Sequence, residues 1–256
     1  MASGITRLAG KIAIVTGGAQ GIGRAIAMRL AQEGAKAAIA DINDMAAQRT
    51  AQEIREAGGQ AIAVKLDVTS LDQAIAAVAQ VERELGPIDI LVNNAGWDKV
   101  EPFVENTPET WDRVIAINFR GPLNCCKAVI PGMQARGRGK IVTISSDAAR
   151  VGSTGEAVYA GCKAGLIGFS KTLARELARY NINVNVVCPG PTETALLRSA
   201  MADRPGVLAA MAKSIPMRRL GQPEDLAGAV AFFASSDSDY ATGQVLSISG
   251  GLTMAG

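Results

Sequence analysis

Histidine is absent from the 256 residues of this chain. It is the usual general base near neutral pH and the commonest metal ligand, so its absence excludes a Ser-His-Asp triad and a histidine-ligated metal. Proton transfer by this protein must therefore use a tyrosine, a lysine or a carboxylate whose pKa is tuned by its surroundings.

Cysteine is scarce, and its spacing indicates no special chemistry. The four cysteines form no Cys-x-x-Cys motif; they are Cys125, Cys126, Cys162 and Cys188. Without such a motif and without histidine, no metal site is expected. The prediction is four reduced structural thiols.

Long apolar runs and blocks of one charge are missing as well. No run reaches the ~18 apolar residues that cross a bilayer. The net charge is only +2, and no block of Lys or Arg indicates nucleic-acid binding. Residues 1–11 contain no signal-peptide core. We expect a cytoplasmic protein with a small-molecule substrate and no membrane or nucleic-acid partner.

Aromatic residues make up only 4% of the chain, so Ala, Val, Ile and Leu must build the core. Short runs of these residues alternate with longer segments of helical period. The runs are apolar throughout, as in parallel strands buried on both faces. Seven strands are predicted at Lys11–Thr16, Lys36–Asp41, Ala61–Asp67, Ile88–Asn93, Gly139–Ser145, Asn183–Cys188 and Gln244–Ser249. Six helices are predicted near Gly21–Glu33, Met45–Ala57, Leu71–Leu85, Pro108–Met133, Ala157–Tyr180 and Pro223–Ser235.

This repetition predicts an α/β fold with a doubly wound, seven-stranded parallel sheet and helices on both faces. No repeat or linker divides it, so residues 1–256 are predicted to form a single domain. Residues from about 190 to 216 are too many for a compact strand-to-helix loop. A long insertion at the carboxyl end of a strand is expected to form a substrate lid. A surface excursion used for oligomer contacts is the alternative.

Three glycines, Gly17, Gly21 and Gly23, follow the first predicted strand and open the first predicted helix. Glycine allows a tight turn and a close approach of the backbone to a pyrophosphate. The N–H groups at the helix N-terminus then face the phosphates. The spacing is G-x-x-x-G-x-G rather than G-x-G-x-x-G, so the position after a strand carries the prediction of a dinucleotide site. A purely structural turn is the alternative.

Asp41 ends the second predicted strand, about 20 residues beyond the glycines. A carboxylate there accepts hydrogen bonds from the adenosine ribose and repels a 2′-phosphate. No basic residue follows it directly, and Gln20 rather than Lys or Arg precedes Gly21. NAD is therefore expected rather than NADP, with a helix-capping role for Asp41 as the alternative.

Tyr159 and Lys163 stand four residues apart in a predicted helix, so they share one face. Together with the features above, they give the chain a clear resemblance to the classical short-chain dehydrogenase/reductase family. The matching motifs are Thr16-Gly17-x-x-x-Gly21-x-Gly23, Asp67-Val68, Asn93-Asn94-Ala95-Gly96, Asn118, Ser146, Tyr159-x-x-x-Lys163 and Pro189-Gly190-x-x-x-Thr194. The resemblance implies a three-layer Rossmann fold, a reversible alcohol–ketone oxidoreduction with a nicotinamide cofactor, and a homotetramer.

The resemblance assigns catalytic roles to four residues. Tyr159 would be the general acid/base on the substrate oxygen, and Lys163 would hold the nicotinamide ribose. Ser146 would hydrogen-bond the substrate oxygen, and Asn118 would hold a water in a proton relay. The Tyr159 pKa of about 10 must fall by about three units to reach neutral pH. One positive charge ~4 Å away supplies about that shift, so Lys163, helped by the oxidised nicotinamide, is expected to lower the pKa of Tyr159.

The same resemblance implies a set of cofactor contacts along the carboxyl edge of the sheet. Asp67 and Val68 would flank the adenine, Asn94 the adjacent ribose, and Thr194 the carboxamide. The full set is Gly17, Gln20, Gly21, Ile22, Gly23, Asp41, Asp67, Val68, Asn94, Ala95, Gly96, Tyr159, Lys163, Pro189, Gly190, Thr192 and Thr194.

Substrate contacts are expected from four residues near these motifs, namely Trp97, Asp98, Asp147 and Arg150, with residues 152–156 also lining the pocket. Trp97 offers a broad apolar wall suited to a ring. Asp147 would either repel an anionic group or pair with Arg150. The surrounding residues resemble the 2-hydroxycyclohexanecarboxyl-CoA dehydrogenase branch, which implies a cyclic 2-hydroxyacyl-CoA or a related alicyclic alcohol. The alternatives are an NADPH-dependent 3-ketoacyl reductase and a non-catalytic dinucleotide-binding protein.

Overall fold

The computed structural model of the protein describes residues 6–201 and 206–254. Seven parallel strands form one sheet in the order β3-β2-β1-β4-β5-β6-β7. The strands are β1 (Ile12–Thr16), β2 (Lys36–Asp41), β3 (Gln60–Lys65), β4 (Ile90–Asn93), β5 (Gly139–Ile144), β6 (Ile182–Pro189) and β7 (Val245–Ile248). The predicted doubly wound, seven-stranded parallel sheet is confirmed, with strand ends that differ by one or two residues.

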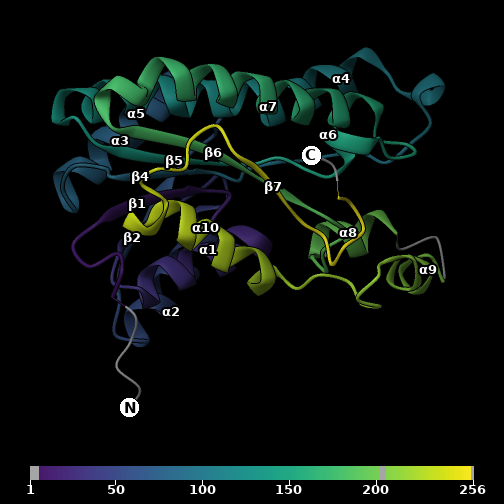
Figure 1. The fold of residues 1–256 in the computed structure, drawn as a ribbon, viewed down its shortest axis with the longest axis horizontal. Coiled ribbons are helices and arrows are strands. Elements are labelled where there is room, and N and C mark those ends of the chain that lie inside the picture. Colours follow the sequence, from purple (N-terminus) through teal and green to yellow (C-terminus); the bar gives the residue numbers. More distant parts are fainter. Residues whose placement is uncertain (1–5, 202–205, 255–256) are drawn as a thin grey trace.

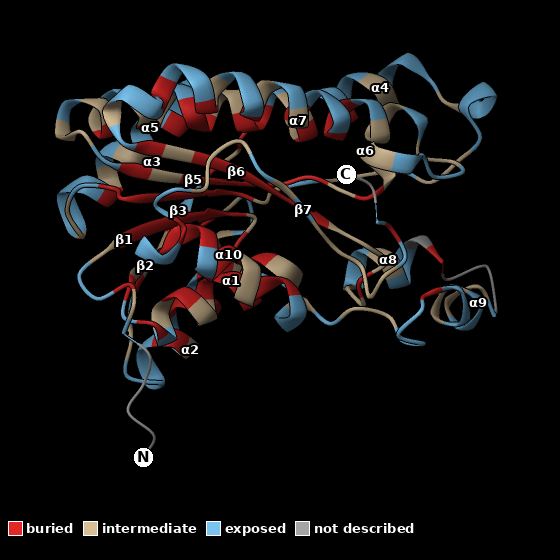
Figure 2. Ribbon diagram, in the orientation of Figure 1, coloured by how far each residue is buried: buried red, intermediate tan, exposed pale blue. Residues whose placement is uncertain are grey.

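Helices cover both faces of the sheet and make three layers (Figure 1). One face carries α1 (Gly21–Gln32), α2 (Asp44–Glu56) and α10 (Pro223–Ala234). The other carries α3 (Leu71–Glu84), α4 (Pro108–Ile115), α5 (Gly121–Arg136) and α7 (Ala157–Leu177). Figure 2 shows the burial concentrated in the sheet and in the helix sides that face it. Alternate strand residues serve the two layers, since Val15 packs in the first and Ile14 in the second.

The sheet order reverses between β1 and β4, whose neighbours lead outward in opposite directions. In open α/β sheets, ligands bind at the carboxyl ends of the strands at this switch point. The glycine turn follows β1 and the Asn94 loop follows β4. The fold therefore brings the two predicted cofactor segments together.

The single helix predicted over 108–133 is wrong, because the segment is interrupted. Between α4 and α5 lies a π-helical turn, Ala116–Arg120. Pro122 has no N–H to donate to the carbonyl of Asn118, and the Asn118 side chain donates to Val114 O at 3.0 Å. Both features disturb the regular i→i−4 ladder. The π-helical turn contains Asn118, which lies in the interior of the protein.

The segment after β6 contains two short helices, α8 (Ala195–Ala200) and α9 (Val207–Ser214). They lie at the same end of the molecule as α6 (Ala148–Val151), beyond the carboxyl ends of the strands (Figure 1). Residues 202–205 of the predicted lid lie outside the described residues. The position suits a lid, and closure over a substrate stays a prediction.

The four cysteines are buried and free. Burial raises the pKa of the Cys125 and Cys126 thiols to about 12, with a further contribution from Cys126 at Cys125. The described part of the chain contains no helix with both the length and the apolar character needed to cross a bilayer.

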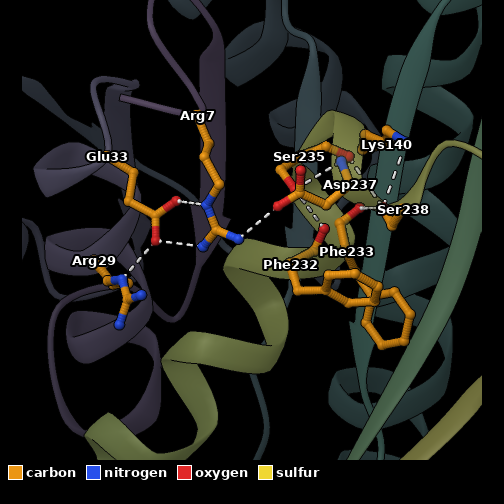
Figure 3. A network of polar contacts seen from close by, with 9 residues as sticks. All are labelled: Arg7, Arg29, Glu33, Lys140, Phe232, Phe233, Ser235, Asp237 and Ser238. Carbon is orange, nitrogen blue, oxygen red and sulfur yellow. Dashed lines mark hydrogen bonds and ion pairs between the residues drawn. The ribbon is translucent and has the colours of Figure 1, made fainter. Parts of the chain in front are cut away.

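At the end of the sheet opposite the glycine turn, an ionic network ties the amino-terminal segment to two helices (Figure 3). Arg7 donates from Nε and Nη2 to the Glu33 carboxylate, both at 2.8 Å, and from Nη1 to Asp237 Oδ2 at 2.8 Å. Arg29 Nε donates to Glu33 Oε1 at 2.6 Å. Glu33 is only 2% exposed. Burial alone would raise the pKa of Glu33, but Arg7 and Arg29 outweigh it and hold that pKa below its usual value.

We expect Glu33→Gln to lower the free energy of unfolding by about 2 kcal/mol near pH 7, because a nearly buried pair loses one partner. A carboxylate with a lowered folded-state pKa stabilises the protein above its unfolded-state pKa, and loses that effect as pH falls through the folded-state pKa. The gap between wild type and variant should therefore shrink below about pH 4. Urea unfolding at pH 7 and pH 3 measures it. Glu53→Gln, which removes an exposed partner of Arg24, is the control. An equal gap at both pH values would contradict this.

Candidate active site

The glycine turn after β1 has a shape that only glycine permits. Gly17 and Gly21 adopt positive φ, +60° and +53°. A Cβ on Gly17 would lie 2.8 Å from Ala95 Cα, and one on Gly23 would lie 2.1 Å from Gly17 O. A Cβ on Gly21 would have only Thr194 side-chain atoms within 4 Å. Packing therefore requires glycine at positions 17 and 23. At Gly21 few protein atoms lie near the position of a Cβ, so a ligand could approach the backbone there.

Hydrogen bonds attach the loop after β4 to this turn. Thr16 Oγ1 accepts from the backbone N–H groups of Asn94 and Ala95 at 3.0 and 3.1 Å. The Asn94 side-chain amide donates to Thr16 O at 3.0 Å and to Gly17 O at 3.1 Å. Asn94 therefore shapes the turn with its amide group, which leaves the carbonyl oxygen for the predicted ribose contact.

Asp41 lies against the glycine turn rather than capping a helix. Its Oδ2 accepts from Ala19 N at 3.1 Å and its Oδ1 from Asn43 N at 3.0 Å. The N-cap of α2 is Asn43, whose side chain accepts from Ala46 N. The helix-capping alternative is therefore wrong for Asp41. Its carboxylate is partly exposed, and its contact with an adenosine ribose stays a prediction.

The predicted adenine contacts, Asp67 and Val68, are fixed by their own neighbours. Asp67 Oδ1 accepts from the Thr69 N–H and hydroxyl at 2.9 and 2.8 Å. Val68 O accepts from Asn124 Nδ2 at 2.9 Å, and a Cβ on Gly121 would lie 2.7 Å from Val68 Cγ2. Residues of α5 thus hold Val68 in place, and the adenine contact stays a prediction.

The loop after β6 contains the last group of predicted cofactor contacts. Gly190 N donates to Ile248 O at 3.0 Å, and Thr192 Oγ1 donates to Gly190 O at 2.9 Å. Thr194 Oγ1 caps α8 by accepting from Leu197 N at 3.1 Å. Of the remaining predicted contacts, Gln20 is exposed and Ile22 is partly buried.

Tyr159, Lys163 and Ser146 come together at the start of α7. The Ser146 hydroxyl is near enough to Tyr159 to act against the rise of its pKa, and Lys163 Nζ lies 5.5 Å from the Tyr159 ring centroid. Neighbouring Ser145 instead donates from Oγ to Lys163 O at 2.8 Å. The structure thus separates the two serines, with Ser146 at the reacting side and Ser145 supporting the helix.

Lys163 is 3% exposed and donates from Nζ to Ile144 O at 2.9 Å. Burial lowers the pKa of its ammonium group to about 8, against the opposing influence of Cys162, Cys188 and Asp98. A Cβ on Gly96 would lie 3.7 Å from Lys163 Nζ and 3.0 Å from Asn118 Oδ1. Both side chains therefore lie close to Gly96, where a larger residue would crowd them.

Asn118 is fully buried and holds the active-site loop. Its Oδ1 accepts from Trp97 N at 3.3 Å, and its Nδ2 donates to Trp97 O and Val114 O. The side chain therefore clamps the backbone of Trp97. Its predicted part in a water relay stays a prediction.

In the protein alone the pKa of Tyr159 is raised, which is opposite to the shift expected from Lys163 together with the oxidised nicotinamide; the effect of the two together stays a prediction. Burial is the largest cause, and the negative charges of Glu156 and Asp98 add to it, while the Ser146 hydrogen bond acts in the opposite direction. The sequence predicts only that Glu156 lines the pocket. Its spacing of three residues before Tyr159 is the signal that indicates a closer relation.

The predicted substrate residues divide into two groups. Trp97 and Asp98 are partly buried in the loop after β4, and the Arg113 guanidinium lies 3.9 Å from the Trp97 ring centroid. Asp147 is only 4% exposed. Its Oδ1 accepts from Ser247 Oγ at 2.6 Å, and the same hydroxyl accepts from Arg150 at 2.8 Å. Asp147 therefore contacts β7 through Ser247, which links it to Arg150, and its part in substrate binding stays a prediction.

Comparisons with known proteins show what this chain is similar to. A family model described as enoyl-(acyl carrier protein) reductase matches residues 17–253. The 3-oxoacyl-[acyl-carrier-protein] reductase FabG of Escherichia coli strain K12 is 41% identical over 247 residues, which cover 96% of this chain and 98% of that protein. Oxidoreductase UcpA of Salmonella typhimurium is 41% identical over 254 residues, covering 97% and 96%.

A crystal structure of a putative gluconate dehydrogenase from Agrobacterium tumefaciens is similar with a TM-score of 0.92 and 35% identity, covering 97% of this chain and 98% of that one. The chain belongs to the short-chain dehydrogenase/reductase family, whose members bind a nicotinamide dinucleotide. It is an oxidoreductase with a Rossmann-like fold.

Proposed function

We propose that the protein interconverts a secondary alcohol and a ketone with NAD as the cofactor. The observation that carries the proposal is the meeting of Tyr159, Ser146 and Lys163 beside the glycine turn, all at the carboxyl edge of the sheet. No other described tyrosine contacts a buried lysine, since Tyr180 lies against Arg179 and Tyr240 is fully exposed.

In this mechanism the nicotinamide, when bound, supplies or accepts a hydride at the substrate carbon. Tyr159 moves the proton at the substrate oxygen, and Ser146 holds that oxygen by a hydrogen bond. Lys163 binds the nicotinamide ribose and brings a positive charge near the Tyr159 hydroxyl. Asn118 holds the loop that carries Gly96 and Trp97, so the reacting groups keep their spacing.

The choice of NAD rests on Asp41. Wild-type protein is expected to reduce NAD more efficiently than NADP, and Asp41→Asn is expected to raise the NADP/NAD ratio of kcat/KM by about 10- to 100-fold. The amide keeps the acceptor for Ala19 N but removes the charge that repels a 2′-phosphate. Steady-state kinetics with both cofactors measure this, with Asp44→Asn, partly exposed and three residues away, as the control. A wild-type preference for NADP would overturn the assignment.

For the substrate we propose a cyclic 2-hydroxyacyl-CoA or a related alicyclic alcohol. Trp97 supports it, because Asn118 holds its backbone and the Arg113 guanidinium lies against its ring. A second candidate is reduction of a 3-oxoacyl thioester with NADPH, which the names of several relatives favour. A panel of alicyclic alcohols, their CoA thioesters and 3-oxoacyl thioesters, assayed in both directions, separates the two. We also propose a cytoplasmic homotetramer, testable by light scattering.

A further inference from the structure

Ala19, a residue of the glycine turn, is held on both sides by residues of the β2–α2 unit. It lies between Gly17 and Gly21, and its N–H donates to Asp41 Oδ2 at 3.1 Å. Its carbonyl oxygen accepts from Thr50 Oγ1 at 3.0 Å. Asp41 ends β2 and Thr50 lies in the middle of α2, so two successive elements of the fold fix the same residue of the turn.

The Thr50 hydroxyl bonds across the fold rather than within its own helix. A threonine inside a helix commonly points to solvent or bonds a carbonyl of the preceding turn. Thr50 is only 2% exposed, and its acceptor lies 31 positions away along the chain. Glu53, three positions later and so on the same side of α2, accepts from Arg24 Nε near the start of α1 at 2.8 Å. Both contacts hold α2 against the amino end of α1, on the face of the sheet that the two helices share (Figure 1).

The hydrogen bond between Thr50 and Ala19 lies in apolar surroundings. Ala19 is 7% exposed and packs in the same hydrophobic cluster as Ala47 and Ala51, which belong to the same helix as Thr50. A carbonyl that loses its donor in such surroundings is unfavourable, so the turn would have to shift to bring that oxygen to water. The Thr50 hydroxyl therefore keeps the Ala19 carbonyl directed inward.

Fixing the Ala19 carbonyl also fixes the N–H of Gln20, because the two groups belong to one planar peptide. No peptide bond of the described residues is cis, and in a trans peptide the C=O and the N–H point in opposite directions. The carbonyl points toward α2, so the N–H points away from it. Gln20 is exposed and is the N-cap residue of α1. Its N–H therefore belongs to the backbone donors that the start of a helix offers to phosphates.

We propose that Thr50 is a positioning residue for the dinucleotide, and that it directs the Gln20 N–H toward the phosphates by holding the Ala19 carbonyl. The inference rests on dinucleotide binding at the glycine turn, which is part of the proposed function. It adds a residue from α2 that lies outside the motifs of the turn. Asp41 and Thr50 then have separate tasks. Asp41 carries the charge that separates NAD from NADP, and Thr50, which is uncharged, supports both cofactors equally.

Thr50→Val tests the proposal, since it keeps the branched shape of the side chain and removes the hydroxyl. We expect the Kd of ADP-ribose, measured by calorimetry, and the KM for NAD to rise about tenfold. The kcat at saturating NAD should stay within about twofold of wild type, because the lost bond lies in the glycine turn and not at Tyr159. The NADP/NAD ratio of kcat/KM should not change, in contrast to the ratio in Asp41→Asn.

Two further variants at the same position separate the hydroxyl from the packing of the side chain. Thr50→Ser keeps the hydroxyl and should bind ADP-ribose with a Kd within about threefold of wild type. Thr50→Ala lacks it, cannot clash with its neighbours and favours a helix, so it should show the same rise in Kd as Thr50→Val. Hydrogen exchange of residues 17–21 in the ligand-free protein should be faster in both variants that lack the hydroxyl.

Thr172→Val is the matched control. Thr172 is exposed in α7, and its hydroxyl donates to Gly168 O of its own helix at 3.2 Å. The same substitution there should leave the Kd of ADP-ribose, the KM for NAD and the exchange of residues 17–21 at their wild-type values.

The proposal is overturned if Thr50→Val and Thr50→Ala bind ADP-ribose as wild type does, or if Thr50→Ser binds it no better than Thr50→Val. ADP-ribose binding needs no turnover. A protein that oxidises no alcohol, yet loses affinity for ADP-ribose in Thr50→Val, would refute the proposed function and support the role of Thr50. An active enzyme in which Thr50→Val binds ADP-ribose like wild type would do the reverse.

Discussion

Tyr159→Phe is expected to lower kcat by about 10³-fold or more while NAD binds nearly as well as to wild type. The substitution removes the Tyr159 hydroxyl, which lies near Ser146, and keeps the ring beside Lys163 Nζ. General acid/base catalysis contributes about 10²–10⁴-fold to a rate, and no histidine is present to replace it. Turnover and NAD titration by fluorescence measure the two quantities separately.

Tyr240→Phe is the matched control, because Tyr240 is fully exposed and loses the same hydroxyl without touching the site. Its kcat should equal that of wild type. If Tyr159→Phe retained turnover within tenfold of wild type, another group would have to move the proton. If it lost NAD binding as well, the defect would lie in the fold of the site rather than in proton transfer.

Lys163→Met is expected to abolish most turnover and yet to make the protein more stable. The ammonium group is 3% exposed, and burial lowers its pKa to about 8. Below that pH the lysine is charged in both the folded and unfolded states, so folding must bury a charge. An apolar side chain of similar length removes that cost, and the free energy of unfolding at pH 7 should rise by on the order of 2 kcal/mol.

The sign of the pH dependence distinguishes this effect from ordinary repacking. Between pH 8 and about 10.5 the unfolded state binds more protons than the folded state, so the stability of the wild type rises with pH over this range. The advantage of Lys163→Met should therefore shrink toward pH 10. Urea unfolding at pH 7 and pH 10 measures it, with Lys171→Met, on an exposed position of α7, as control. A variant less stable than wild type at pH 7 would contradict the prediction.

The sequence predicts the sheet well because its strands are continuous apolar runs with one plausible environment. β2, for example, is buried along its centre and is found at the predicted residues. Tyr159 and Lys163 are likewise predictable, since residues four apart on a helix must share a face. In each case the deciding information lies within a few residues along the chain.

Features that depend on distant partners are harder to predict. Asp147 is predicted to line a pocket, but its carboxylate is bound by Ser247, 100 positions away along the chain. The π turn at Ala116–Arg120 depends on Pro122 together with the Asn118 side chain bonding its own helix. The influence of Asp98 on the pKa of Tyr159 depends on the loop after β4, about 60 residues before Tyr159 in the chain. Local periodicity carries none of this information.

The attachment of the β4 loop to the glycine turn has a consequence for engineering. At one end of this loop, Asn94 is hydrogen bonded to the glycine turn. Four positions later, Asp98 lies near enough to Tyr159 to influence its pKa. Between them, the backbone of Trp97 is hydrogen bonded to Asn118. The predicted cofactor contacts and the predicted substrate contacts are therefore carried by one short piece of backbone. Changing the turn to suit a different cofactor is expected to shift Trp97 and Asp98 as well, so the two specificities should be selected together.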